Sequence, residues 1–279
     1  MADVTKSADS MAVKPAGGPG SYFAIIVTLA AIAIGFFMYF VVFGASGNFV
    51  NGDVNNHPIG ENPGKLFGLF YKGGILVPFA IGLMLMVVIF SVERFITLGK
   101  ASGTGSIDVF VQKIQMSLAD GNVGRAMEEC DKIKGSVGNV IKEVLRKYRE
   151  VERDPGMNKE AKMAATSKAL EESVALELPM LEKHLVIIAT IVSIATLLGL
   201  IGTVIGMIKA FSALATAGSP DAVALATGIS EALINTALGI TTSTIATIMY
   251  NYFTSQIDGL TYKMDEAGYS IVQSFAEKA

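Results

Sequence analysis

The sequence predicts an all-α protein that crosses a membrane several times. Of its 279 residues, 51 % are hydrophobic and only 17 % are charged, with a mean hydropathy of +0.51. A water-soluble domain is rarely so apolar. Four nearly uncharged runs are also long enough to cross a lipid bilayer, which takes roughly 20 apolar residues, and no strand-like alternation competes with them. We therefore expect a multi-pass transmembrane helical protein with long helices that extend into the cytoplasm.

The first third of the chain is expected to hold a tail, two spans and a loop. Residues 1–20 end in a Gly- and Pro-rich stretch and are expected to form a flexible N-terminal tail. Residues 21–43 are predicted to be the first transmembrane helix. A cleaved signal peptide is the alternative, but its apolar region is only about 7 to 15 residues long, so we favour a retained span. The Gly-, Asn- and Pro-rich residues 44–72 are predicted to form an irregular periplasmic loop with little core of its own, followed by the second transmembrane helix at 73–98.

Residues 99–184 are the one large polar segment and are predicted to form a cytoplasmic helical domain. They contain 14 Lys and Arg against 14 Asp and Glu, a balance typical of helices with salt bridges on their surfaces. A long helix is expected to start near Met157, to kink at Pro179 and to run directly into the next span. The three short helices expected before it cover Ile107–Leu118, Val123–Ile133 and Val140–Val151.

The last third is predicted to hold two more spans and a final helix. The third transmembrane helix is expected at 185–217 and the fourth at 221–257, with a turn at Gly218–Pro220 and a cytoplasmic C-terminal helix at 258–279. Basic residues flank the polar segment where it meets the second and third spans, which favours a cytoplasmic position for that segment. With four spans, both termini are then cytoplasmic as well.

Composition argues against several classes of function. The single cysteine, Cys130, cannot form an intramolecular disulfide, and the two histidines match no common hydrolase motif. No phosphate-binding loop is present, so neither a metal nor a cofactor is expected and an enzyme is disfavoured. The net charge of −3, without a cluster of basic and aromatic residues, argues against a nucleic-acid partner.

Glu231 is the residue in the spans that most needs an explanation. It is the only charged residue between Ala222 and Ile257, and it lies 11 residues past Pro220, which is about 16 Å into the membrane at 1.5 Å per helical residue. An ionisable side chain at that depth is unfavourable by several kcal/mol unless it faces protein or water. We expect no second ionisable group in the spans to act with it. Glu231 is therefore the candidate proton carrier.

Polar residues near Glu231 are expected to divide between two faces of the fourth span. On an ideal helix Asn235 lies about 40° and Thr242 about 20° from Glu231, and the three form one stripe. Thr236 lies about 140° away and is expected to face a neighbouring helix. On the third span, Thr203 is within about one turn of the level of Glu231, so the two can share a polar layer.

Small residues at helical spacing on the third span predict close packing against the fourth. Gly202 and Gly206 form a Gly-x-x-x-Gly pair, and Gly239 is a small residue on the fourth span. Membrane helices of every function use such features, and intramembrane hydroxyls often bond only to their own helix. A non-conducting membrane scaffold therefore stays open as an alternative. The residues of this face are Thr196, Gly199, Thr203, Gly206 and Ala210.

Two segments of these spans resemble the ExbB/TolQ/MotA proton-channel family and are most similar to ExbB. They read LLGLIGTVIGM over residues 197–207 and GISEALINTALGI over residues 228–240. The corresponding family motifs have the form LLGLxGTVxGM and GIxEALxxTAxGL. By motif position, Thr203, Glu231 and Thr236 correspond to the family's polar channel lining.

The resemblance also implies an assembly and a set of partners. It implies a homo-oligomer, a pentameric ring in the bacterial inner membrane, around the single spans of an ExbD-like partner whose membrane aspartate carries the proton. A TonB-like energy transducer would pass the motion on to transport across the outer membrane. This chain departs from the family pattern at Thr196 and Ile245, where prolines are usual, at Asn235, where alanine is usual, and in the additional span at 21–43. A TolQ-like envelope role, a gliding or secretion motor and a flagellar stator are the alternatives on the same plan.

Overall fold

The computed structural model describes residues 19–54, 56, 58–60, 63–215 and 221–277, which form two compact units, 1–86 and 87–279. The expected N-terminal tail, up to residue 18, and the expected turn at Gly218–Pro220 lie outside the described residues. The all-α prediction is confirmed: the described part of the chain is helical, and its only strand-like feature is an isolated bridge between Phe49 and Pro58. Four of the described helices are long and apolar enough to cross a membrane.

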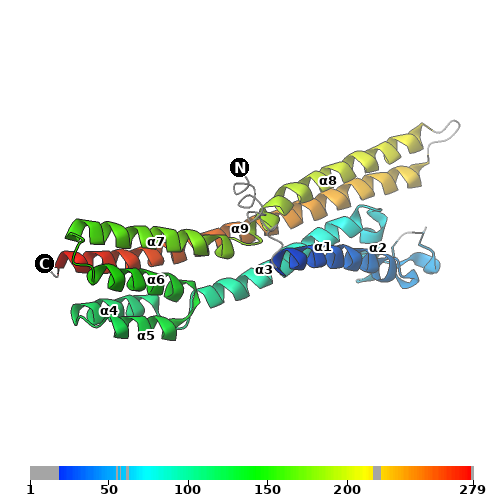
Figure 1. Cartoon of the computed structure of the whole chain (residues 1–279). Coiled ribbons are helices and arrows are strands. Elements are labelled where there is room, and N and C mark those ends of the chain that lie inside the picture. Colours follow the sequence, from blue (N-terminus) through cyan, green and yellow to red (C-terminus); the bar gives the residue numbers. More distant parts are fainter. Residues whose placement is uncertain (1–18, 55, 57, 61–62, 216–220, 278–279) are drawn as a thin grey trace, which may run out of the picture. The chain divides into compact units, whose positions relative to one another are not determined.

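The first unit contains α1 (Pro19–Phe37), α2 (Gly64–Lys72) and the beginning of α3 (Val77–Ala101) (Figure 1). After α1 the helix widens into a π-helical turn, Met38–Phe43, so the helical segment covers the first predicted span. Glycine lets α1 and α3 approach closely, because a Cβ atom at Gly35 would lie 2.3 Å from the Pro78 carbonyl oxygen. Two short 3-10 turns, Ser46–Asn48 and Val50–Gly52, lead on toward α2.

The described residues between 44 and 72 contain more regular structure than the irregular loop that the sequence predicts. Their C-terminal part forms α2, whose aromatic residues pack against the end of the first span. The ring centroids of Tyr39 and Tyr71 are 4.8 Å apart, and those of Phe43 and Phe67 are 5.5 Å apart. Phe67 and Tyr71 are four residues apart and so lie on one helix face. This four-residue spacing of aromatic residues lies in a segment rich in glycine and proline, and it gives the segment a small aromatic core.

The second unit is a helical bundle joined to two long membrane helices. Its short helices follow the predicted order, and α5 has the predicted bounds. Helices α4, α6 and α7 all contact α9, and Figure 1 shows them beside its C-terminal part. The side chains of Ile114, Ile141, Leu145 and Tyr148 are fully buried. The helices are α4 (Ile107–Ala119), α5 (Val123–Ile133), α6 (Gly135–Glu152), α7 (Lys159–Leu181), α8 (Leu185–Leu214) and α9 (Ala222–Glu277).

Helix α6 begins five residues earlier than predicted, because the chain reverses over a very short connection. Lys134 has φ +57° and ψ −178°, and Gly135 has φ +77°. Both φ angles lie in the region that favours glycine. The Gly-rich stretch that suggests a loop therefore needs only these two residues to turn, and the remainder joins the helix.

The predicted continuous helix from Met157 into the third span is wrong, because the chain breaks between α7 and α8. Helix α7 ends at Leu181, two residues past Pro179, and His184 takes φ +66° before α8 begins. Side chains from α3 hold this break. Arg94, only 1 % exposed, donates to the Leu181 carbonyl oxygen at 3.0 Å, and the His184 Nδ1 atom lies 3.2 Å from a Glu93 oxygen. By contrast, α9 continues for 56 residues through the predicted boundary at 257.

Candidate functional site

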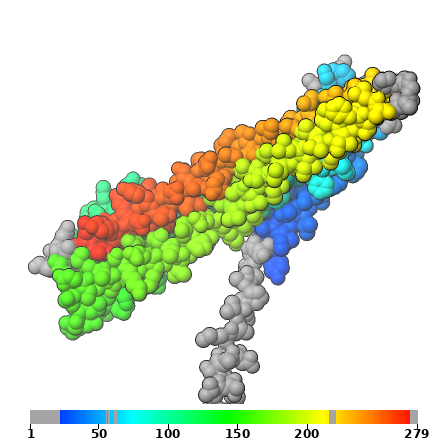
Figure 2. All heavy atoms as spheres, turned by 90° about the horizontal axis from the view of Figure 1, so that it is seen from above, coloured from blue at the N-terminus to red at the C-terminus, as the bar shows by residue number. Residues whose placement is uncertain are grey.

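Helix α8 packs closely against the N-terminal part of α9, as the small residues predict (Figure 2, α8 in yellow and this part of α9 in orange). A Cβ atom at Gly206 would lie 2.6 Å from both the Ala232 nitrogen and the Gly228 oxygen, and one at Gly239 would lie 2.6 Å from the Ala195 oxygen. These neighbours are backbone atoms, so the two helices are as close as their backbones allow. Gly199 and Gly202 belong to the same contact, against Thr236 and Asn235 respectively.

The stripe predicted on the fourth span lies against α8. Glu231, Asn235 and Thr242 are 6 %, 1 % and 1 % exposed. Asn235 Nδ2 donates to the Glu231 carbonyl oxygen at 3.0 Å. The Thr242 hydroxyl is buried and has no hydrogen-bond partner among the described residues. The stripe therefore faces the neighbouring span of the same chain.

The Glu231 carboxylate is paired with a lysine from α8, contrary to the expectation of a lone charge in the spans. The Lys209 ammonium donates to one carboxylate oxygen at 2.7 Å and to the other at 2.8 Å. The Glu231 side chain is 8 % exposed, whereas that of Lys209 is 52 % exposed. The sequence contains both residues, but Lys209 looks like a flanking charge near the end of a span. Its distance from Glu231 becomes visible only when α8 and α9 are packed together.

The hydroxyl groups form a second cluster. The hydroxyls of Thr203 and Thr236 lie within hydrogen-bond distance of each other, and each also lies within reach of the Gly199 carbonyl oxygen, at 3.1 and 3.3 Å. Because each hydroxyl has one proton, only one of the two donates to this carbonyl while they are hydrogen-bonded to each other. Thr236 thus faces a neighbouring helix, as predicted, and that helix is α8. The structure brings Thr203 to Thr236, whereas Glu231 pairs with Lys209.

Thr196 lies further along the same contact toward the start of α8. Its hydroxyl donates to its own helix, at the Val192 carbonyl oxygen, over 3.2 Å. Ser243 of α9 donates to the same oxygen at 2.8 Å and so links the two helices. Ser243 lies outside the set of site residues that the sequence predicts. Its place seven residues after Thr236, two helical turns on, is the signal that could have identified it.

Helix geometry explains why the two polar sets separate. The small residues of α9 that contact α8 lie about 70° around the helix from Glu231, and Thr236 lies about 70° beyond them. On α8, Thr203 and Lys209 lie about 60° to either side of the glycine face. The α8·α9 contact therefore has a charged flank, Lys209 and Glu231, and a hydroxyl flank, Thr196, Thr203, Thr236 and Ser243.

The hydroxyl flank leads to a pocket near the start of α8. The pocket has a volume of about 380 Å³, and its lining includes Glu182, Thr190, Thr254 and Asp258. Thr254 lies 18 residues after Thr236 on α9, which is five full turns, so both are on one face of the helix. Two carboxylates thus stand at the end of a line of hydroxyls.

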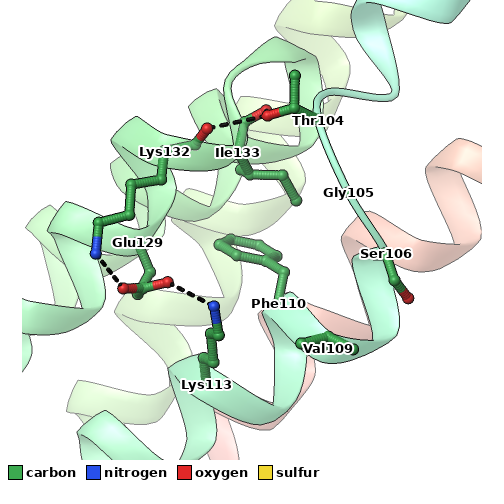
Figure 3. Close-up of a pocket in the computed structure, with 9 residues that line it drawn as sticks. All are labelled: Thr104, Gly105, Ser106, Val109, Phe110, Lys113, Glu129, Lys132 and Ile133. Atoms are coloured by element: carbon green, nitrogen blue, oxygen red, sulfur yellow. Dashed lines mark hydrogen bonds and ion pairs between the residues drawn. The ribbon is translucent and has the colours of Figure 1, made fainter.

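A smaller pocket of about 230 Å³ lies in the bundle between α4 and α5 (Figure 3). Its charges are already paired: Glu129 accepts from Lys132 at 2.6 Å and lies 3.3 Å from Lys113. The hydrogen bond from Lys132 and the charge of Lys113 lower the pKa of Glu129. Among the described residues no group of three or more His, Cys, Asp or Glu side chains is placed to hold a metal ion. The charged groups of both sites form ion pairs.

The helices and their polar flanks define a multi-pass membrane protein with an ion pair between two of its spans. Residues 133–266, from the end of α5 through most of α9, match the MotA/TolQ/ExbB proton channel family. The matched segment covers just under half of the chain. Both flanks of the α8·α9 contact lie within the matched segment.

Named relatives agree with the family. A biopolymer transport ExbB homolog of Methanothermobacter thermautotrophicus is 28 % identical over 221 residues, 77 % of this chain and 74 % of the relative. The Tol-Pal system protein TolQ of Pseudomonas aeruginosa is 32 % identical over 124 residues, 44 % of this chain and 54 % of the relative. The biopolymer transport protein ExbB of Pseudomonas putida is 35 % identical over 86 residues, 31 % of this chain and 26 % of the relative. The match to TolQ thus spans about half of that relative's length, and the match to the Pseudomonas putida ExbB about a quarter.

Proposed function

We propose that this chain is the proton-conducting subunit of an ExbB-type motor in a bacterial inner membrane. Protons would cross along α8 and α9, and the resulting motion would energise outer-membrane transport through a TonB-like protein. One observation carries the proposal: a buried carboxylate, Glu231, lies between two spans that belong to the proton channel family domain. A carboxyl group inside a membrane is rarely kept unless it has a function.

The residues of the two flanks have different proposed roles. Glu231 takes up and releases the proton, because it has the only carboxyl group in the α8·α9 contact. Asn235 and Thr242, on the same stripe, position Glu231 and the water near it. The hydroxyls of Thr203, Thr236 and Thr196 each offer a donor and acceptors, so they can order water along the hydroxyl flank. The pocket with Glu182 and Asp258 is the proposed end of this path.

The proposed assembly is a pentameric ring of this chain around an ExbD-like single-span partner, with both termini in the cytoplasm. Large apolar side chains remain exposed on the outer faces of α8 and α9, which suits contact with lipid or with a neighbouring copy of the chain. Leu197, Leu200, Val204, Leu233 and Ile240 are all more than half exposed. Native mass spectrometry in mild detergents tests this, and a chain that stays monomeric in all of them would contradict the ring.

The function is tested by Glu231→Gln, which keeps the size and hydrogen bonding of the side chain and removes its titration. We expect loss of uptake driven by the proton-motive force, with an unchanged yield of oligomer. Glu171→Gln, on an exposed face of α7, is the matched control and should leave uptake as in the wild type. Thr203→Ala and Thr236→Ala should weaken uptake less, because a hydroxyl orders water but carries no charge. Full uptake with Glu231→Gln would leave a structural role for the carboxylate.

A TolQ-like role in the cell envelope is the second candidate. The similarity to a TolQ supports it, because that relative has a higher identity than the ExbB homolog, although over a shorter segment. The two candidates share the proton chemistry and differ in the client protein. Deleting the gene separates them: loss of energised uptake favours the ExbB-type role, and a leaky envelope with normal uptake favours the TolQ-type role.

A further inference from the structure

The pairing of Glu231 with Lys209 adds a second functional residue to the site. Both carboxylate oxygens accept from the same ammonium, at 2.7 and 2.8 Å. No other charged side chain of α8 or of the membrane part of α9 is available to Glu231, because Lys209 is the only charged residue in 185–214 and Glu231 the only one in 222–257. At the start of α9, Asp221 instead accepts from the backbone of Val223 and Ala224. Lys209 is therefore the one charged side chain of α8 that contacts this carboxylate.

The two partners differ in their freedom to move. Glu231 is held on the α9 face that packs against α8, and its side chain is 8 % exposed. The Lys209 side chain is 52 % exposed and has a flexible four-carbon stem. An ammonium on such a stem can withdraw while its own helix stays in place.

We propose that Lys209 gates the protonation of Glu231, because its ammonium and the transported proton compete for the same carboxylate. While the ion pair is closed, both carboxylate oxygens are occupied and the site is electrically neutral. A proton binds when Lys209 withdraws, and release of the proton lets the ammonium return. The relevance of this exchange to transport rests on the proposed function, but the competition itself is a property of the chain alone.

The test measures the protonation of Glu231 directly in the purified full-length chain. An apolar carbodiimide adds to a protonated carboxyl group in an apolar site: the acid proton moves to one nitrogen, the carboxylate oxygen bonds to the central carbon, and the acyl group then migrates to nitrogen. Nothing leaves, so intact and peptide masses rise by one reagent. Glu231→Gln identifies the labelled residue, because it must lose that signal.

We expect Lys209→Gln to be labelled at Glu231 about tenfold faster than the wild type, or more, near neutral pH. A neighbouring opposite charge changes the protonated fraction of a carboxyl group by this order, and an unpaired carboxylate in an apolar site takes up a proton. Lys209→Arg keeps the cation and should stay as slow as the wild type. Equal rates for the wild type and Lys209→Gln, or a fast Lys209→Arg, would overturn the proposal.

A second measurement covers the case in which Lys209→Gln does not fold. Wild-type labelling should be slow near neutral pH and rise as the pH falls, and fast labelling at neutral pH would overturn the gating role. The outcomes also separate the two proposals. If labelling follows Lys209 as expected but Glu231→Gln retains full uptake, the gating of protonation stands and the proposed function fails.

Discussion

Replacing Gly239 with alanine tests the closeness of α8 and α9 on which both flanks depend. The new Cβ atom would lie 2.6 Å from the Ala195 oxygen, about 0.8 Å closer than the 3.4 Å at which ordinary contact begins. Moving the helices apart by that amount would stretch the 3.3 Å bond from Thr236 to the Gly199 oxygen to about 4 Å, where it is no longer a hydrogen bond. Overpacking of this kind is unfavourable by about 1–3 kcal/mol.

A matched control lies on the same helix. A Cβ atom at Gly259 would meet nothing within 4 Å, so Gly259→Ala should gain the roughly 0.5–1 kcal/mol by which alanine exceeds glycine in a helix. Gly239→Ala makes the same gain but must move backbone atoms, and its net effect should be a loss of about 0.5–2 kcal/mol. The measurement is the temperature at which half of the oligomer loses its size-exclusion peak in detergent. The close-packing argument fails if Gly239→Ala is as stable as Gly259→Ala.

Two further predictions concern the helical bundle. Burial raises the pKa of the Cys130 thiol to about 12, so at pH 8 only about one thiol in ten thousand is ionised. Maleimide should therefore label the protein quickly only after denaturant is added. Rapid labelling of the folded protein would contradict this. Lys134→Gly should stabilise the bundle by about 1 kcal/mol, because it relieves the strained backbone at φ +57°. Lys132→Gly, inside α5, should destabilise the bundle by a similar amount. Denaturant unfolding gives the free energy of unfolding of each variant, and equal changes in the two variants would refute the strain.

The fold was predictable wherever hydrophobic runs or helical patterns decide the structure. The four spans and the bounds of α5 follow from such patterns, whereas the predicted boundary at residue 257 is absent because α9 continues through it. The break at His184 did not follow, because Glu182, Lys183 and His184 include neither glycine nor proline. It depends on Arg94 and Glu93, which come from a distant part of the sequence and bind the chain at this point. A tertiary contact of this kind leaves no local signal.

The site was predictable along one helix but not between two. The stripe of Glu231, Asn235 and Thr242 follows from the helical period, and so does the separate direction of Thr236. The partner of Glu231 does not, because its identity depends on how far α8 is shifted along α9. That shift is set by glycine contacts at both ends of the pair, and it brings Lys209 to Glu231 and Thr203 to Thr236.

The continuity of α9 has a mechanical consequence. Its 56 residues form a rod of about 84 Å at 1.5 Å per residue, and the same rod carries Glu231 at one end and the bundle contacts at the other. A helix resists twisting about its own axis, so the Glu231 segment is rigidly coupled to the segment of α9 that contacts α4, α6 and α7. The second connection between the membrane helices and the bundle, from α7 to α8, is broken at His184, where Arg94 and Glu93 hold the chain. The chain thus connects its membrane helices to the bundle twice, once by an unbroken helix and once through a turn.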